Sequence, residues 1–278
     1  MLGAFPIPLG LQQVFGCVRP IIFRNPEFPY MSVPGTGFLL EMFGEVFLVT
    51  ARHVADNGAF DLQDLRIPTN HAKSDSPVIQ FLDARTATSR DPDDTDHVDV
   101  IVARCDRKHL DRSLFINDHP FDITLRPLVT SFVKGMELHF QGVAPAHHAH
   151  TIDDDAQKYC IVYAAGGLIY REPSEDRGIH IADAHVHDTC PDFNGMSGSP
   201  VFHIENVHAR NTRAQFAGMV IRGSREQKVM RFIGAELISV HVSQFFLNGL
   251  SKTQATEKLK TLLEAYMHEH GHPFAGWD

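Results

Sequence analysis

Residues 35–54 read GTGFLLEMFGEVFLVTARHV, and this segment sets the architecture that we expect. It contains two short apolar runs, Gly37–Leu40 and Val46–Val49, separated by a segment with a glycine. Short runs rich in Val, Ile and Phe that are bounded by turn-forming residues are typical of strands in a β-sandwich or barrel. The same pattern recurs up to about residue 245, with runs at 98–102, 159–163 and 216–221. The sequence therefore predicts an all-β fold.

Three segments depart from this pattern. Residues 83–96 are polar and are expected to form a surface loop. Pro120–Leu128 is expected to connect the two halves of the chain. After Ser251, Lys and Glu alternate with apolar residues at helical spacing, namely Leu259, Leu262, Leu263 and Tyr266. This predicts an amphipathic helix that docks on the core and is ended by Gly271 and Pro273.

Composition excludes several classes of function. The chain has 278 residues, of which 43% are apolar and 21% charged, as in ordinary globular proteins. Its net charge is −9 and it has no Lys/Arg stripe, so no nucleic-acid partner is expected. No run approaches the ~18 apolar residues of a membrane span, and the N-terminus lacks the features of a secretory signal. The cysteines show no C-x-x-C spacing and are expected to be reduced thiols in a cytoplasmic protein: Cys17, Cys105, Cys160 and Cys190.

The motif NGMSGSP, residues 194–200, is the first candidate for chemistry. Ser197 has a glycine two positions before it and another directly after it. Glycine permits the tight backbone turn that points two N–H groups at one spot. Ser199 is the rival nucleophile, but only Ser197 has glycine at both positions.

A histidine and an aspartate complete the candidate set. His53 lies in the segment TARHV directly after an apolar strand. Its imidazole has an ordinary pKa near ~6.5 and can therefore take and return a proton at neutral pH. Asp99 precedes the apolar residues 100–102, where a buried carboxylate needs a partner such as a histidine N–H. Asp96 is the second candidate for this role.

The order His53, Asp99, Ser197 is the order found in chymotrypsin-type proteases. Over about residues 30–250 the chain resembles the trypsin/chymotrypsin superfamily, in particular its stand-alone bacterial trypsin-like peptidases. The resemblance implies two antiparallel six-stranded β-barrels followed by a C-terminal α-helix. The implied units are an N-terminal barrel with the histidine and aspartate, a C-terminal barrel with the serine, and a helix with a tail, at 1–125, 126–250 and 251–278.

The resemblance also implies a serine endopeptidase that acts through an acyl-enzyme intermediate. Ser197 would attack the scissile carbonyl, His53 would act as base and then as acid, and Asp99 would orient the imidazole. The N–H groups of Gly195 and Ser197 would form the oxyanion hole. The alternative function is a catalytically silent trypsin-like module that binds peptides or proteins without cleaving them.

The substrate-binding strand implied by the resemblance runs over residues 216–223. Ile221, Arg222 and Gly223 occupy its working positions, and Gly223 is expected to leave the pocket mouth open. Where trypsins carry an aspartate that binds Arg or Lys, this chain has Pro191. A small or apolar substrate side chain is therefore favoured, although Arg222 could instead attract an acidic one.

Regulation, partners and cofactors follow from the remaining motifs. Met196 stands where relatives activated from zymogens have an aspartate, so we expect an enzyme that is active as synthesised or controlled by loop ordering or a regulatory protein partner. The expected partner is a protein or peptide substrate, with neither nucleic acid nor membrane, and no cofactor is required. Metal is not expected, because the histidine-rich segments lack a recognised zinc spacing, at 147–150, 183–188 and 268–272.

Overall fold

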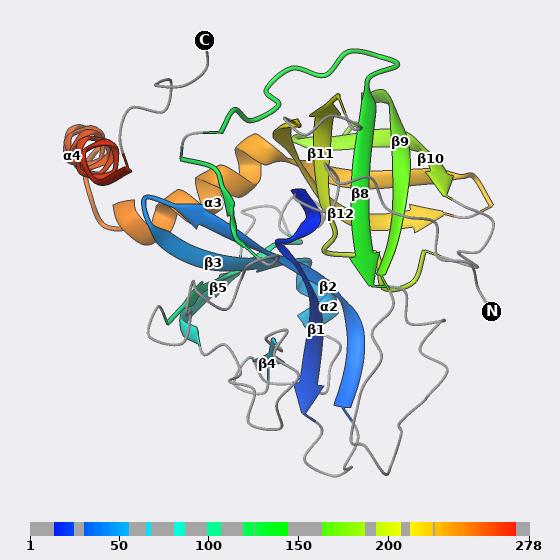
Figure 1. Cartoon of the computed structure of the whole chain (residues 1–278), viewed down its shortest axis with the longest axis horizontal. Helices are drawn as coiled ribbons and strands as arrows, with labels where there is room; N and C mark the ends of the chain where they lie inside the picture. The colour runs from blue at the N-terminus through cyan, green and yellow to red at the C-terminus, as the bar shows by residue number, and fades with distance from the viewer. Residues whose placement is uncertain are drawn as a thin grey trace.

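The computed structural model describes residues 14–24, 31–55, 65–67, 81–86, 99–106, 119–124, 126–143, 163–186, 193–206, 212–224 and 226–270. This part of the chain is mostly β-structure, with one closed barrel, a second sheet and two long helices toward the C-terminus (Figure 1). Of the expected all-β fold with two six-stranded barrels, the predominance of β-structure and one closed six-stranded barrel are confirmed. Within the described residues, no helix is long and apolar enough to cross a membrane.

The N-terminal half forms a seven-stranded sheet. Its strands follow the order β4-β1-β2-β3-β6-β5, and β7 pairs in parallel with β2. The described strands form an open sheet, whereas the resemblance implies a closed barrel here. The strands are β1 (Val18–Arg24), β2 (Met31–Met42), β3 (Glu45–Thr50), β4 (Leu65–Arg66), β5 (Phe81–Thr86), β6 (Ile101–Cys105) and β7 (Phe121–Asp122).

The C-terminal half forms a closed six-stranded barrel. Its strands follow the order β10-β13-β12-β11-β8-β9, and every pairing in it is antiparallel. Closure leaves no edge strand that would expose a full row of unpaired backbone groups. The strands are β8 (Glu137–Val143), β9 (Tyr163–Pro173), β10 (Ile179–Val186), β11 (Pro200–Glu205), β12 (Arg213–Ser224) and β13 (Val229–Gly234).

Two segments differ from the sequence-based expectation. Residues 83–86 belong to β5 and not to a loop, because β5 pairs with β6 and takes its edge position in the sheet. An edge strand tolerates charged side chains, which is why the composition of β5 resembles a loop. Residues 235–247 form a helix, α3 (Ala235–Leu247), where the apolar pattern suggests continued β-structure. Ile238 and Val242, four residues apart, are fully buried, so one helical face packs on the core.

The C-terminal end therefore holds two helices where the sequence predicts one. The second, α4 (Lys252–His270), covers most of the predicted amphipathic segment and lies beyond the end of α3 at the periphery (Figure 1). Its described side chains are mostly exposed. Tyr266 is the exception, because it is buried and its hydroxyl donates a 2.7 Å hydrogen bond to Asp122 Oδ2.

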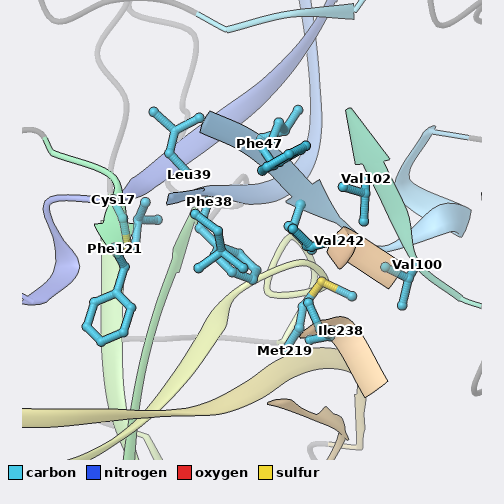
Figure 2. Packing of buried hydrophobic residues seen from close by; sticks show 14 of the residues in the cluster. Cys17, Phe38, Leu39, Phe47, Val100, Val102, Phe121, Met219, Ile238 and Val242 are labelled. Atoms are coloured by element: carbon cyan, nitrogen blue, oxygen red, sulfur yellow. The ribbon is translucent and has the colours of Figure 1, made fainter. Parts of the chain in front are cut away.

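One hydrophobic cluster joins the open sheet to the barrel. It contains Phe38 and Phe47 from the sheet, Met219 from β12, and Ile238 and Val242 from α3 (Figure 2). The rings of Phe38 and Phe216 meet across this junction with 5.5 Å between their centroids. A fully buried side chain of this kind contributes roughly 1.5–3 kcal/mol of hydrophobic stabilisation. The cluster thus holds β2, β3 and β12 in a fixed relation, and these strands carry the candidate site.

Candidate active site

His53 and Asp99 meet because the strands that carry them are paired. β3 leads directly into the short helix α2 (Arg52–Ala55), which contains His53, and Asp99 lies two residues before β6. β3 and β6 are antiparallel neighbours with Thr50 opposite Ile101, so the end of one strand lies beside the start of the other. Residues 46 positions apart in sequence are therefore brought into direct contact.

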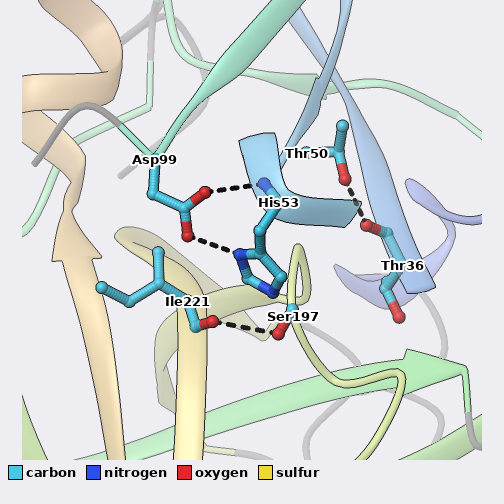
Figure 3. Close-up of polar contacts among 6 residues, drawn as sticks. All are labelled: Thr36, Thr50, His53, Asp99, Ser197 and Ile221. Atoms are coloured by element: carbon cyan, nitrogen blue, oxygen red, sulfur yellow. Dashed lines mark hydrogen bonds and ion pairs between the residues drawn. The ribbon is translucent and has the colours of Figure 1, made fainter. Parts of the chain in front are cut away.

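Both carboxylate oxygens of Asp99 accept a hydrogen bond from His53. The backbone N–H of His53 donates to Oδ1 at 2.9 Å, and ring Nδ1 is 2.7 Å from Oδ2 (Figure 3). A third bond, from the Arg52 N–H to the Asp99 carbonyl oxygen at 3.2 Å, ties the two backbones together. These contacts fix the orientation of the imidazole.

The geometry also determines which ring nitrogen is basic. An ionised carboxylate only accepts hydrogen bonds, so Nδ1 must carry the proton that points at Asp99. In the neutral imidazole, Nε2 is then the acceptor. The Asp99 side chain is only 10% exposed, whereas the His53 side chain is 52% exposed. The pair therefore combines a buried carboxylate with an imidazole that is about half exposed.

Ser197 sits in a turn that is pinned between β2 and β12. Its carbonyl oxygen accepts a 3.0 Å hydrogen bond from the Thr36 N–H, and the Gly198 N–H donates to the Val220 carbonyl at 2.8 Å. Gly195 and Gly198 have φ values of 79° and 87°, a left-handed backbone that favours glycine. A side chain on Gly198 would also collide with the carbonyl oxygen of Thr36. Both glycines of the motif are thus required by the turn.

The serine turn and the histidine helix contact the same point of β2. A Cβ placed on Gly35 would lie 2.8 Å from the methyl groups of Val54 and 3.2 Å from the carbonyl oxygen of Ser197. Val54 directly follows His53 in α2, and in Figure 3 the ring of His53 points toward Ser197. The absence of a side chain at Gly35 lets the two segments approach each other.

The hydroxyl of Ser197 is engaged with a backbone acceptor. Its Oγ donates a 2.9 Å hydrogen bond to the carbonyl oxygen of Ile221 in β12 (Figure 3). To pass its proton to Nε2 of His53, the hydroxyl would have to leave this acceptor. A rotation about the Cα–Cβ bond of the serine is the smallest motion that does so.

The backbone N–H groups of Gly195 and Ser197 make no hydrogen bond within the described residues, although their neighbours do. The Met196 N–H donates to the Phe193 carbonyl at 3.1 Å, and the Ser199 N–H donates to the Met196 carbonyl at 2.9 Å. The Met196 and Ser199 N–H groups are thus bonded within the turn, and the Gly198 N–H is bonded to β12. Those of Gly195 and Ser197 are left available to an incoming oxygen.

Ser199 and Met196 occupy buried positions. Ser199 is fully buried, and its Oγ has no hydrogen-bond partner within the described residues. It packs on Gly142, where a side chain would collide with its hydroxyl. Met196 is 1% exposed and belongs to the barrel's own hydrophobic cluster. Neither side chain can be reached by a substrate, which leaves Ser197 as the accessible hydroxyl of the motif.

The proposed substrate strand is paired differently on its two sides near Ser197. On one side, Arg222–Ser224 pair with Val229–Arg231 of β13. On the other side, β12 pairs with β11 over Arg213–Met219. The next residue, Val220, exchanges backbone hydrogen bonds with Gly198 and Ser199 of the serine turn. Arg222 and Gly223 are exposed, and Ile221 is buried.

Gly223 does not leave open space, contrary to the expectation from sequence. A Cβ on this residue would lie 2.7 Å from Cδ2 of Phe193, so the phenyl ring fills that space. Pro191 and Asp96 lie outside the described residues, as do most residues of the three histidine-rich segments. Across the described part of the chain, no group of three His, Cys, Asp or Glu side chains could hold a metal ion.

Thr36 is a residue of the site that the sequence analysis missed. Its hydroxyl donates to the Gly195 carbonyl at 2.6 Å and accepts the Val143 N–H at 2.7 Å. Its own carbonyl accepts the Thr50 hydroxyl at 2.7 Å. The only local signal was a threonine between two glycines in an apolar strand. That pattern does not reveal partners more than 100 residues away.

Neither the models of known protein families nor the curated proteins compared with this chain give a match.

Proposed function

We propose that this chain is a serine endopeptidase with a two-barrel, chymotrypsin-like architecture, in which the N-terminal sheet is the counterpart of the first barrel. The observation that carries the proposal is the double hydrogen bond between His53 and Asp99, which leaves Nε2 as the basic nitrogen. The serine turn pinned against the same strand supports it. The combination of hydroxyl, oriented base and buried carboxylate is what hydroxyl-activated acyl transfer requires.

The proposed reaction has two halves. In the first, Ser197 Oγ leaves the Ile221 carbonyl, transfers its proton to His53 Nε2 and bonds to the scissile carbonyl carbon. The carbonyl oxygen becomes an oxyanion that accepts hydrogen bonds from the N–H groups of Gly195 and Ser197. Losing one such donor typically raises the barrier by about 3–4 kcal/mol. The C–N bond then breaks, the amine takes the proton from Nε2, and an acyl-enzyme remains.

Water completes the cycle in the second half. It gives a proton to His53 Nε2 and attacks the ester carbon, and the bond to Ser197 Oγ breaks as the hydroxyl regains its proton. Asp99 keeps its charge throughout and stabilises the imidazolium. The end of β12 beyond its pairing with β11 supports a peptide substrate, because an extended chain can add to a strand as a further strand.

A fluorophosphonate probe with mass-spectrometric mapping tests the proposal. Such probes label a serine only where its hydroxyl is activated, so we expect labelling at Ser197 and none at Ser199. Cleavage of a peptide library should be abolished by Ser197→Ala, with kcat lower by about 10⁶-fold, as for nucleophile removal in related chemistry. Folded protein that is neither labelled nor active would refute the proposal.

A peptide-binding module without catalysis is the second candidate. The hydrogen bond from Ser197 Oγ to the Ile221 carbonyl favours it, because the hydroxyl is held by the backbone and not by the imidazole. This candidate predicts binding of library peptides with equal affinity for the natural chain and Ser197→Ala, and no turnover by either. Turnover that depends on Ser197 would exclude it.

A further inference from the structure

The strand β5 ends the N-terminal sheet, on the far side of β3 from the barrel (Figure 1). One of its sides pairs with β6, and no described strand pairs with the other. Leu82, Asp83 and Thr86 are exposed, with 57% of Leu82 accessible to solvent. The opposite edge strand of the sheet, β4, has only two residues, and the barrel is closed. β5 is therefore the longest edge strand of the described fold, and such an edge can pair with another strand.

The charged residues of β5 are only loosely paired within the chain. Asp83 and Arg85 lie two positions apart and therefore share a face of the strand. Arg85 Nε and Asp83 Oδ2 are 3.6 Å apart, beyond the about 2.7–2.9 Å of a charge-assisted hydrogen bond. Among the described residues, Arg104 lies directly opposite Asp83 in β6 but forms no ion pair with it, and the Nε of Arg104 is buried without a hydrogen-bond partner. The Asp83 side chain, 44% exposed, can therefore take a further cation.

The order of these charges makes β5 complementary to itself. When two β5 strands pair antiparallel about a two-fold axis at Ala84, Asp83 of each copy lies directly opposite Arg85 of the other. Moving the axis to Asp83 would place two carboxylates opposite each other, and moving it to Arg85 would do the same for two guanidinium groups. Like charges that are directly opposite destabilise a strand pair. Charges on an edge strand usually discourage pairing, whereas this sequence favours one partner in one register.

We propose that the edge of β5 is a self-association surface, through which two copies of this chain form a dimer with Ala84 on the two-fold axis. The inference does not depend on the proposed endopeptidase function. A pairing of two six-residue strands is smaller than the ~1,200 Å² or more that stable complexes bury, so the dimer is reversible and depends on concentration. Each copy uses the same edge, so the assembly closes at two chains.

Exchanging the charges tests the pairing. Light scattering during size-exclusion chromatography, over a dilution series, should show the mass of the natural chain rising toward twice that of one chain. Asp83→Arg and Arg85→Asp should each be monomeric over the same series, because each variant places like charges opposite each other. An equimolar mixture of the two variants should form dimers again, since one strand then carries two positive charges and the other two negative charges. The variant that carries both substitutions should also dimerise.

Ala84→Cys gives a second readout that does not involve charge. The two copies of this position face each other across the axis with Cβ atoms about 4.5–5.5 Å apart, so mild oxidation should link two chains. Thr86→Cys is the matched control, because its two copies lie on opposite sides of the axis and should be linked much less. The natural chain gives the background. Crosslinking also provides the result if Arg85→Asp is unstable in a thermal melt, since the Arg85 guanidinium packs on Phe245.

Asp183→Arg is the control for the charge change itself. Asp183 is likewise a half-exposed acid with a loosely placed arginine, Arg171 at 3.9 Å, but its strand has a neighbour on both sides in the closed barrel. This variant should dimerise like the natural chain. A natural chain that stays monomeric at its highest soluble concentration would overturn the inference. So would a dimer that persists in both Asp83→Arg and Arg85→Asp, because its interface would then lie elsewhere.

Discussion

At the scale of single residues, the orientation of His53 depends on the charge of Asp99. The carboxylate accepts from both the backbone N–H and ring Nδ1 of His53, so only one tautomer of the neutral imidazole suits the site. In the proposed function, Asp99 would therefore act by fixing which ring nitrogen of His53 carries the proton, without contacting a substrate.

Asp99→Asn tests this role. The asparagine NH₂ group can donate to Nδ1, which would leave the imidazole proton on Nε2 and remove the base. We expect kcat/KM for peptide cleavage to fall by about 10⁴-fold, the loss typical of this substitution in enzymes with the same constellation. The thermal unfolding temperature should change little.

Ser199→Ala is the matched control for this experiment, because Ser199 lies in the same motif but is buried with an unpartnered hydroxyl among the described residues. Its cleavage activity should stay within a few-fold of the natural chain. Equal losses in the two variants would contradict the roles assigned to Asp99 and Ser199.

At the scale of elements, β2 organises the site through Thr36. The hydroxyl of this residue joins the serine turn to the end of β8, by donating to the Gly195 carbonyl and accepting the Val143 N–H. Thr36→Val keeps the shape of the side chain and removes both bonds. Each buried group left unpaired costs about 1–3 kcal/mol.

We therefore expect Thr36→Val to lower both the free energy of unfolding, measured in urea, and the rate of fluorophosphonate labelling at Ser197. Thr50→Val provides the comparison, since it removes the bond to the Thr36 carbonyl and no hydrogen bond of the serine turn. Its labelling rate should stay close to that of the natural chain. A labelling rate equal in all three proteins would show that Thr36 does not hold the turn.

β10 contributes a pH dependence to stability. Burial lowers the pKa of His180 from 6.5 to about 4, and its Nδ1 is buried without a partner in the described residues. Between pH 6.5 and about 4 the unfolded chain binds a proton at this histidine that the folded chain does not. The stability that neutral His180 contributes to the folded state is therefore fully present above pH 6.5, and it is lost as the pH falls from 6.5 to about 4.

His180→Phe should weaken that dependence. The substitution keeps an aromatic ring beside Phe132, Tyr170 and Phe232 and removes the titrating group. Urea unfolding at pH 7 and pH 4.5 should show a smaller loss of stability for the variant than for the natural chain. Identical losses would mean that His180 titrates normally in the folded state.

At the scale of the whole molecule, the two C-terminal helices differ in importance. α3 contributes Ile238 and Val242 to the cluster that joins sheet and barrel, whereas α4 is mostly exposed and is held at Tyr266. Ile238→Ala should cost about 2–5 kcal/mol, because it empties a site in a close-packed core. A chain that ends at residue 250 should lose less free energy of unfolding than the Ile238→Ala variant.

Two measurements apply to both variants: urea unfolding gives the loss of stability, and fluorophosphonate labelling of the folded protein reports on Ser197. We expect the shortened chain to keep labelling, since α4 carries none of the groups of the candidate site. A shortened chain that is less stable than Ile238→Ala would show that α4 is part of the cooperative core.

Local patterns in the sequence were sufficient to predict a strand-rich architecture and to single out His53, Asp99 and Ser197 as the candidate side chains. Apolar runs bounded by turn formers marked strands such as β3 and β6, and the glycines at 195 and 198 marked a tight turn. Both signals arise from the backbone preferences and burial of neighbouring residues, which a single sequence records. The contact between His53 and Asp99 was expected because a buried carboxylate needs a partner and because of the resemblance, and not from the local pattern around either residue.

Tertiary contacts decided everything that depends on partners far apart in the chain. Residues 235–247 became a helix because Ile238 and Val242 meet the core of both halves, although their local pattern also suits a strand. Thr36 became the support of the serine turn through partners 107 and 159 residues away. The space beside Gly223 was filled by Phe193, a residue 30 positions earlier, because packing matches side chains by their position in the fold and not by their order in the sequence.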